Sequence, residues 1–152
     1  MKKVLLTVMI LILAVSLVGC GSSYGKIKSA FEKEGYAEQE IKAGDDYKKL
    51  EEEMKEDGIE FTVHHLQEDA LIGKKNVIIL EFKNIDGIKD VLEGDNDVAD
   101  AMKGLLEALD TTYEEIYDEL VEVGLVNGNC MFIISLADVV YLNETLEIFK
   151  NA

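Results

Sequence analysis

The sequence contains no arginine, no proline and no tryptophan, and it has only two cysteines and two histidines. All 15 basic residues are lysine, and 31 aspartates and glutamates outnumber them, which gives a net charge of −16. Because phosphate contacts need clustered lysine or arginine, this balance argues against a nucleic-acid partner. With so few histidines, candidates for acid–base chemistry at neutral pH are also few.

The longest apolar run is too short to be a permanent membrane span. It lies at the N-terminus, where Lys2 and Lys3 precede the uncharged residues 4–18. A spanning helix needs roughly 20 apolar residues, whereas a run of about 15 after a basic start is typical of a cleavable signal peptide. This segment is therefore interpreted as an export signal.

The signal ends in Leu17-Val18-Gly19-Cys20, with leucine three residues before the cysteine and a small residue directly before it. This pattern resembles the lipobox of bacterial lipoproteins, and the resemblance covers residues 1–20. It implies that Cys20 receives a diacylglyceryl group and becomes the first residue after cleavage. The alternative is an ordinary secretory signal in which Cys20 is incidental. We expect a protein that is anchored to the cell membrane through lipid on Cys20 and faces outside the cytoplasm.

Cleavage before Cys20 predicts a signal peptide (1–19), a lipidated tether (20–23) and one domain (24–152). The signal holds two of the lysines and none of the acidic residues, so the mature chain has 133 residues and a net charge of −18. Once Cys20 is lipidated, Cys130 is the only thiol left. An intramolecular disulfide is then impossible, and stability must come from the hydrophobic core. The lysines after the tether are expected near the lipid, with the acidic bulk farther out.

The spacing of apolar residues predicts the secondary structure. Helical spacing predicts helices at about 24–34, 45–57, 85–92, 98–109, 113–121 and 139–149. Alternation from Ile59 predicts a half-buried strand, and the apolar run at 77–82 predicts a central strand covered on both faces. The fold class is α+β: a small sheet of three or four strands, from a hairpin over about 59–83 and a strand at about 129–135, packed by about five or six helices.

Local signals refine this prediction. Asn127-Gly128 is typical of a tight turn before the third strand. Thr111 and Thr112 each precede a glutamate by three residues, the spacing of a capping box, so a helix is expected to start there. The predicted core consists of Phe61, Val63, Val77, Ile79, Leu105, Leu120, Phe132, Ile134, Leu146 and Phe149.

His64 and His65 are adjacent in the first predicted strand. Neighbouring strand residues point to opposite faces, so the two imidazoles are not expected to share a metal ion or a proton. His65 is in phase with the apolar residues and His64 with the solvent face. We expect a core histidine beside a surface histidine and no catalytic pair.

Two further features suggest chemistry but have simpler explanations. Cys130 alternates in phase with apolar neighbours, so it is expected to be buried and inert; as a nucleophile it would need a histidine base, such as His65. Asp95, Asp97 and Asp100 suggest calcium, but the spacing of an EF-hand is not met. Helix capping by Asp95 or Asp97 explains these carboxylates.

The sequence beyond residue 23 resembles no family of known function and contains no cofactor motif. A secreted enzyme is expected to show a nucleophile, a base and an orienting group, and no such set emerges from the candidates above. We therefore expect a binding domain with a protein or small-molecule partner and without a cofactor or metal. The alternative is a small cell-envelope hydrolase that uses His65 or Cys130.

Overall fold

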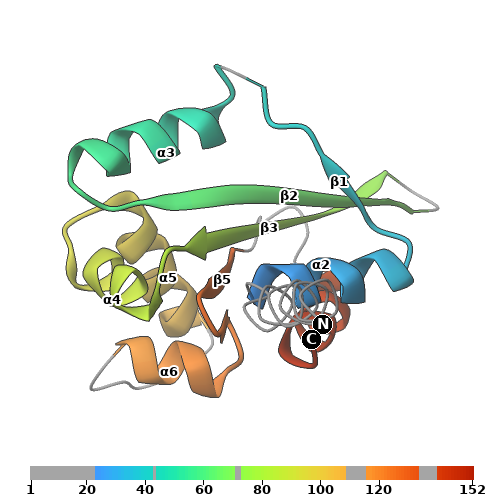
Figure 1. The fold of residues 1–152 in the computed structure, drawn as a ribbon. Helices are drawn as coiled ribbons and strands as arrows, with labels where there is room; N and C mark the ends of the chain where they lie inside the picture. Colours follow the sequence, from blue (N-terminus) through green and yellow to red (C-terminus); the bar gives the residue numbers. More distant parts are fainter. Residues whose placement is uncertain (1–22, 43, 71–72, 109–115, 134–139) are drawn as a thin grey trace, which may run out of the picture.

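The structure is a computed structural model that describes residues 23–42, 44–70, 73–108, 116–133 and 140–152 (Figure 1). Its elements are α2 (Ser23–Lys33), β1 (Ala37–Gln39), α3 (Asp46–Glu56), β2 (Phe61–Asp69), β3 (Lys74–Phe82), α4 (Ile85–Glu93), α5 (Asp97–Ala108), α6 (Ile116–Glu122), β4 (Val126–Asn127), β5 (Cys130–Ile133) and α7 (Leu142–Lys150). The predicted α+β class is confirmed.

The strands form one antiparallel sheet in the order β1-β2-β3-β5-β4. Five strands are present where three or four were predicted. The predicted hairpin corresponds to β2 and β3, and the predicted third strand to β5. The additional strands, β1 and β4, have three and two residues. Strands this short show no measurable alternation, because a period of two needs at least four residues to be recognised.

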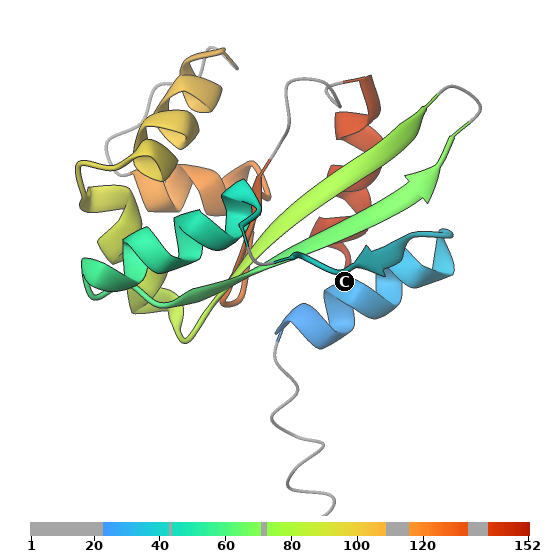
Figure 2. The same cartoon turned by 90° about the horizontal axis from the view of Figure 1, so that it is seen from above.

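The helices cover both faces of the sheet. In Figure 1, α3 lies alone above the sheet, and α2 and α7 lie below it. The helices α4, α5 and α6 gather at the end of the sheet where β2 begins, as Figures 1 and 2 both show. β2 was predicted to have one buried and one solvent-facing side. Helices instead lie on both sides of it, so the residues expected to face solvent are partly covered.

The central strand is β3, as its continuous apolar run predicted. Val77, Ile78, Ile79 and Leu80 are all buried, and they alternate between the two faces. Neighbouring strands pair with β3 on both sides, β2 over all nine of its residues and β5 over four. The longest run of buried apolar residues in the sheet therefore lies in its central strand.

A Schellman motif turns the chain from α2 into β1. The N–H of Gly35 donates to the carbonyl of Glu32 (3.2 Å), and the N–H of Tyr36 donates to the carbonyl of Phe31 (3.1 Å). Gly35 has φ +94°, a conformation that favours glycine. The rings of Phe31 and Tyr36 pack edge to face at 5.1 Å, the apolar contact that accompanies this motif. The motif brings β1 back beside α2.

The core prediction is confirmed for six residues and corrected for two. Val63, Val77, Ile79, Leu120, Phe132 and Phe149 are buried. Phe61 and Leu146 are partly buried and pack against the core from its margin. The side chains of Leu105 and Ile134 lie outside the described residues, as do Thr111 and Thr112 of the predicted capping box. A tight turn joins β4 and β5 as predicted, but it is centred on Gly128 and Asn129, because Asn127 belongs to β4 and pairs with Cys130; Gly128 has φ +60°.

Candidate functional site

Among the described residues, the most connected polar cluster lies around His64, where α2 packs on the sheet. His64 was predicted to face solvent, and that prediction is wrong: its side chain is only 14% exposed. The ring stacks on Tyr24 of α2, with 3.4 Å between ring centroids and 14° between planes. The error arose because α2 covers the face of β2 that the alternation assigned to water. Tyr24 sits on the apolar face of α2 predicted from its spacing.

The imidazole of His64 bridges two carboxylates from different strands. Its Nδ1 lies 2.8 Å from Oε1 of Glu38 in β1, and its Nε2 lies 3.0 Å from Oε2 of Glu81 in β3. These two contacts tie β1, β2 and β3 together, because each ring nitrogen lies within hydrogen-bond distance of a carboxylate from a different neighbouring strand.

Glu38 accepts hydrogen bonds from two further residues, both in α2. The Tyr24 hydroxyl donates to Oε1 at 2.6 Å, and Nζ of Lys28 donates to Oε2 at 2.6 Å. Burial alone would raise the pKa of Glu38, but the hydrogen bonds from its three neighbours outweigh burial and lower this pKa to about 2. Burial, and then the bond to Glu38, raises the pKa of Tyr24 above its usual range.

The arrangement suits a structural role better than proton transfer. Glu38 is paired with Lys28, and the imidazole of His64 lies between Glu38 and Glu81, so the polar groups of the cluster contact one another. Both nitrogens of His64 already face carboxylates, so neither is directed at a substrate position. The Tyr24 hydroxyl donates to Glu38, and its pKa is raised, whereas an activated nucleophile needs a lowered pKa. The cluster holds α2 and the edge strand β1 to the sheet.

His65 points to the other face of the sheet, as predicted. Its Nε2 lies 3.0 Å from Oδ1 of Asn76, which also accepts from Nε2 of Gln67 at 2.8 Å. The ring of Tyr47 from α3 lies 6.3 Å away. His65 is partly buried among these residues. The two histidines do not share a site, and His65 occupies a polar corner beneath α3.

Cys130 is buried and fully inaccessible, which confirms its predicted position in the core. Burial, with a smaller contribution from the nearby Glu81 carboxylate, raises the pKa of the Cys130 thiol to about 12. Cys130 pairs with Glu81 in the register of β3 and β5, so it shares the face of His64. His65, considered as its base, points to the opposite face and is not positioned for that role.

The three aspartates considered for calcium lie around the start of α5. The residue that caps this helix is Asn96, and not Asp95 or Asp97 as predicted: its Oδ1 accepts from the N–H of Ala99 at 2.9 Å. Its Nδ2 also donates to the carbonyl of Val91 at the end of α4 (2.7 Å). An amide can serve both helix ends because it accepts and donates, which a carboxylate cannot. In the part of the chain that the structure describes, no three His, Cys, Asp or Glu side chains are grouped to hold a metal ion.

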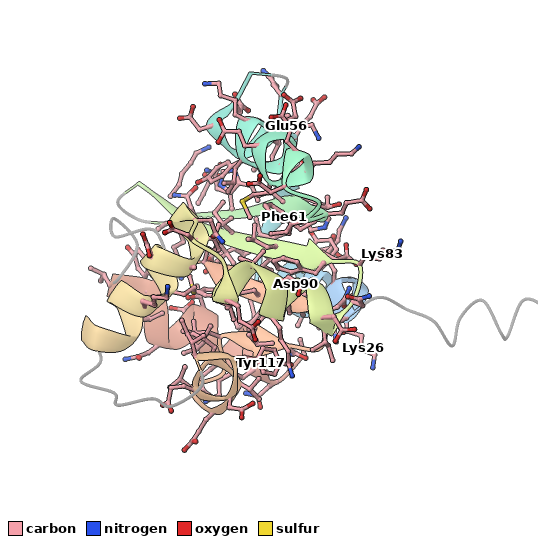
Figure 3. The ribbon with its side chains drawn as sticks, turned by 90° about the vertical axis from the view of Figure 1, so that its left-hand side faces the viewer. Lys26, Glu56, Phe61, Lys83, Asp90 and Tyr117 are labelled. Atoms are coloured by element: carbon pink, nitrogen blue, oxygen red, sulfur yellow. The ribbon has the colours of Figure 1, made fainter. Side chains whose placement is uncertain are left out.

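Sequence reasoning missed a second feature, the outer edge of β2 beside α3. β1 pairs only with residues 65–67 of β2, so the start of β2 lies beyond the end of β1. There the N–H of Val63 donates to Oε1 of Glu51 in α3 at 2.7 Å, and the other oxygen of Glu51 accepts from Lys48. Two depressions, of about 600 and 410 Å³, adjoin this edge. Figure 3 shows Phe61 beneath α3 at this end of the sheet.

Cys20 lies outside the described residues, and α2 begins at Ser23. Within the described ranges, no helix has the length and apolar content needed to cross a bilayer. Comparisons with protein-family models, curated proteins and solved structures found no match. Function is therefore inferred from the arrangement of this chain's own residues.

Proposed function

We propose that this protein is a lipid-anchored, extracytoplasmic binding domain that holds a partner outside the cytoplasmic membrane and performs no chemistry of its own. One observation carries the binding half of the proposal: the side chains best suited to catalysis are engaged in internal contacts. His64 is bonded to two carboxylates, His65 contacts Asn76, and Cys130 is inaccessible. A general base or nucleophile must reach the substrate, and these groups are directed inward.

The same contacts weigh against a hydrolase built on His65 or Cys130. A thiol nucleophile needs a lowered pKa or an adjacent base, whereas burial raises the pKa of Cys130 to about 12. His65 lies on the opposite face of the sheet, so it cannot supply that base. A reaction that used His65 and Cys130 together would require the sheet to open.

The position of α2 supports the anchoring half of the proposal. α2 begins three residues after Cys20, a separation that an extended chain spans in about 10 Å. The N-terminal end of α2 would then lie close to the lipid headgroups. Lys26 of α2 and Lys83, directly after β3, lie on one side of the molecule (Figure 3), where they would favour an anionic surface.

Detergent-phase partitioning and labelling with a fatty-acid probe test the anchor. Wild-type protein from its native membrane should enter the detergent phase and carry the label, and Cys20→Ala should do neither. Cys130→Ala removes the other thiol and is the matched control, which should behave as the wild type. Labelling of Cys20→Ala would show that the lipid anchor is wrong.

Alanine variants test binding against catalysis. Cells that lack the native gene should regain the wild-type phenotype from His65→Ala, provided that circular dichroism shows a folded variant. Cys130→Ala, which shortens a buried side chain only slightly, should also restore it. Loss of the phenotype by a folded variant of either residue would favour the hydrolase.

A further inference from the structure

The open edge of β2 indicates what kind of partner this domain binds. Alternate residues of an antiparallel strand direct their backbone N–H and C=O groups toward the same neighbour. Val63 directs its N–H toward Glu51 and away from β3, so Phe61 and Val63 face the side where β1 lies. β1 ends at Gln39, opposite His65. Among the described residues, the position next to Phe61 and Val63 holds no strand.

Glu51 partly fills this position. Its carboxylate accepts the hydrogen bond from Val63 that the carbonyl of a neighbouring strand would otherwise accept. The Glu51 side chain is 12% exposed and is also held by Lys48 of the same helix. A single side chain satisfies one donor of the edge, whereas a strand would pair with its carbonyl groups as well. Glu51 can therefore be displaced by a chain that offers more hydrogen bonds.

The two depressions leave room for such a chain beside Val63 and Phe61. The larger is lined by α2, by residues 36–41 along and just beyond β1, and by Val63. The smaller lies between α3 and Phe61. A strand paired with Phe61–Val63 would border both depressions, because Val63 lines the larger and Phe61 the smaller. Its side chains would alternate between the face of α3 and the face of α2.

The charged residues that line the two depressions favour a positively charged peptide. The two depressions are lined by six glutamates and three lysines: Glu32, Glu38, Glu40, Glu51, Glu52 and Glu60, with Lys28, Lys48 and Lys55. Lys28 is already paired with Glu38, and Lys48 with Glu51. An incoming lysine or arginine would meet excess negative charge, and an acidic chain would be repelled.

We propose, on the basis of the binding function proposed above, that the domain binds an extended, lysine- or arginine-containing peptide that adds as a strand to the edge of β2 over Phe61–Val63. The peptide continues the line of β1 and takes the Val63 N–H from Glu51. The released Glu51 carboxylate then pairs with a basic side chain of the peptide. Backbone hydrogen bonds supply affinity, and the glutamates supply the preference for positive charge.

Fluorescence anisotropy with the full chain in detergent tests this proposal directly. The probe is a labelled octapeptide of alternating lysine and threonine, and saturable binding is expected. An octapeptide with the same side chains but N-methylated at alternate residues keeps the charge and loses the edge-facing donors. Its affinity should be at least about tenfold weaker. Equal affinity for the two peptides would show that charge alone causes binding, and it would overturn strand addition.

Variants of α3 separate displacement of Glu51 from a general effect of charge. Glu51→Ala frees the Val63 N–H and should bind the lysine-threonine octapeptide about three- to tenfold more tightly. Glu53→Ala removes the same charge from the exposed side of α3 and should change the affinity less than about twofold. Glu60→Lys should weaken binding by about threefold or more, with Glu122→Lys, on α6, as the control.

These measurements are independent of the lipid anchor. If neither the wild type nor Glu51→Ala binds the octapeptide, strand addition is wrong, whatever the outcome of the partitioning experiment. If binding occurs but Cys20→Ala still labels with lipid, the edge proposal stands and the anchoring proposal fails.

Discussion

β2 and β3 are neighbouring strands of equal length, but they are stabilised in different ways. β3 lies in the middle of the sheet, with paired strands on both sides and four consecutive buried apolar residues. β2 borders the short edge strand β1, and much of its surroundings is polar: His64 contacts two carboxylates, His65 contacts Asn76, and Val63 donates to Glu51. Apolar burial dominates in one strand, and charges and hydrogen bonds contribute strongly in the other.

The difference in stabilising contacts suggests that β3 maintains the fold and that the margin of β2 is available for binding. Apolar burial depends little on pH or salt, so β3 and its neighbours keep the fold together. Ion pairs at the margin are partly exposed and exchange readily with other partners. A binding site is expected in the second kind of region, because a partner must replace existing contacts at low cost. The open edge of β2 meets this condition.

The largest expected effect comes from truncating the same residue type in each region. Phe132 is buried and packs on Phe149, with 5.4 Å between ring centroids. Phe132→Ala should lower the free energy of unfolding by about 3–5 kcal/mol, measured by urea denaturation. Phe61 is only partly buried at the margin, so Phe61→Ala should cost less than about half as much. Equal losses would show that the margin contributes to stability as much as the centre.

Replacing either histidine by alanine should lower the free energy of unfolding by less than Phe132→Ala does. The two histidines differ in the number of carboxylates that they contact. His64→Ala removes the imidazole that lies between Glu38 and Glu81, together with its stack on Tyr24. We expect a loss of about 1–3 kcal/mol. His65→Ala removes one hydrogen bond to Asn76 and should cost about 0.5–1.5 kcal/mol. A larger loss for His65 would mean that the corner beneath α3, and not the carboxylate cluster, stabilises this side of the sheet.

The same contrast explains what the sequence could predict. The central strand, the turn at Gly128 and the burial of Cys130 follow from local patterns, because apolar runs and glycine conformation are properties of a few adjacent residues. The pairing of β1 is a tertiary event. Ala37–Gln39 has no alternation of its own, and it joins the sheet because the Schellman motif at Gly35 returns the chain beside β2.

The candidate sites were harder to predict for a related reason. Strand alternation correctly placed His64 and His65 on opposite faces, but it could not show that α2 covers the face of His64. Asn96 was overlooked as a cap because the flanking aspartates dominate the local charge. The contact between Glu51 and Val63 joins residues from different elements, and no spacing in the sequence predicts it.

Protonation of Glu38 in acid should lower the free energy of unfolding by a modest amount. Its folded-state pKa, about 2, lies below the ordinary value of about 4.3, so its contribution to stability is complete above the ordinary value. That contribution is lost as the pH falls from about 4.3 toward 2. Partial exposure limits it to about 0.2–1 kcal/mol. Denaturation midpoints of wild type and Glu38→Gln should therefore converge in acid, whereas Glu56→Gln, an exposed control on α3, should parallel the wild type throughout. Profiles of Glu38→Gln and wild type that stay parallel would show that the cluster does not shift this carboxyl.

The smallest expected effect is that of calcium, although the chain is strongly acidic. Asp95 and Asp100 are exposed, Asp100 lies 3.8 Å from Lys103, and the cap of α5 is the amide of Asn96. Cations should stabilise the domain by screening its self-repulsion, as the Debye length contracts from roughly 30 to 8 Å between about 10 and 150 mM monovalent salt. Calcium at matched ionic strength should add almost nothing to the melting temperature. A specific site would instead add about 2.7 kcal/mol at a hundredfold excess over Kd. A saturable calcium shift that Asp95→Asn abolishes would contradict this prediction, and it would place a second binding site at the start of α5.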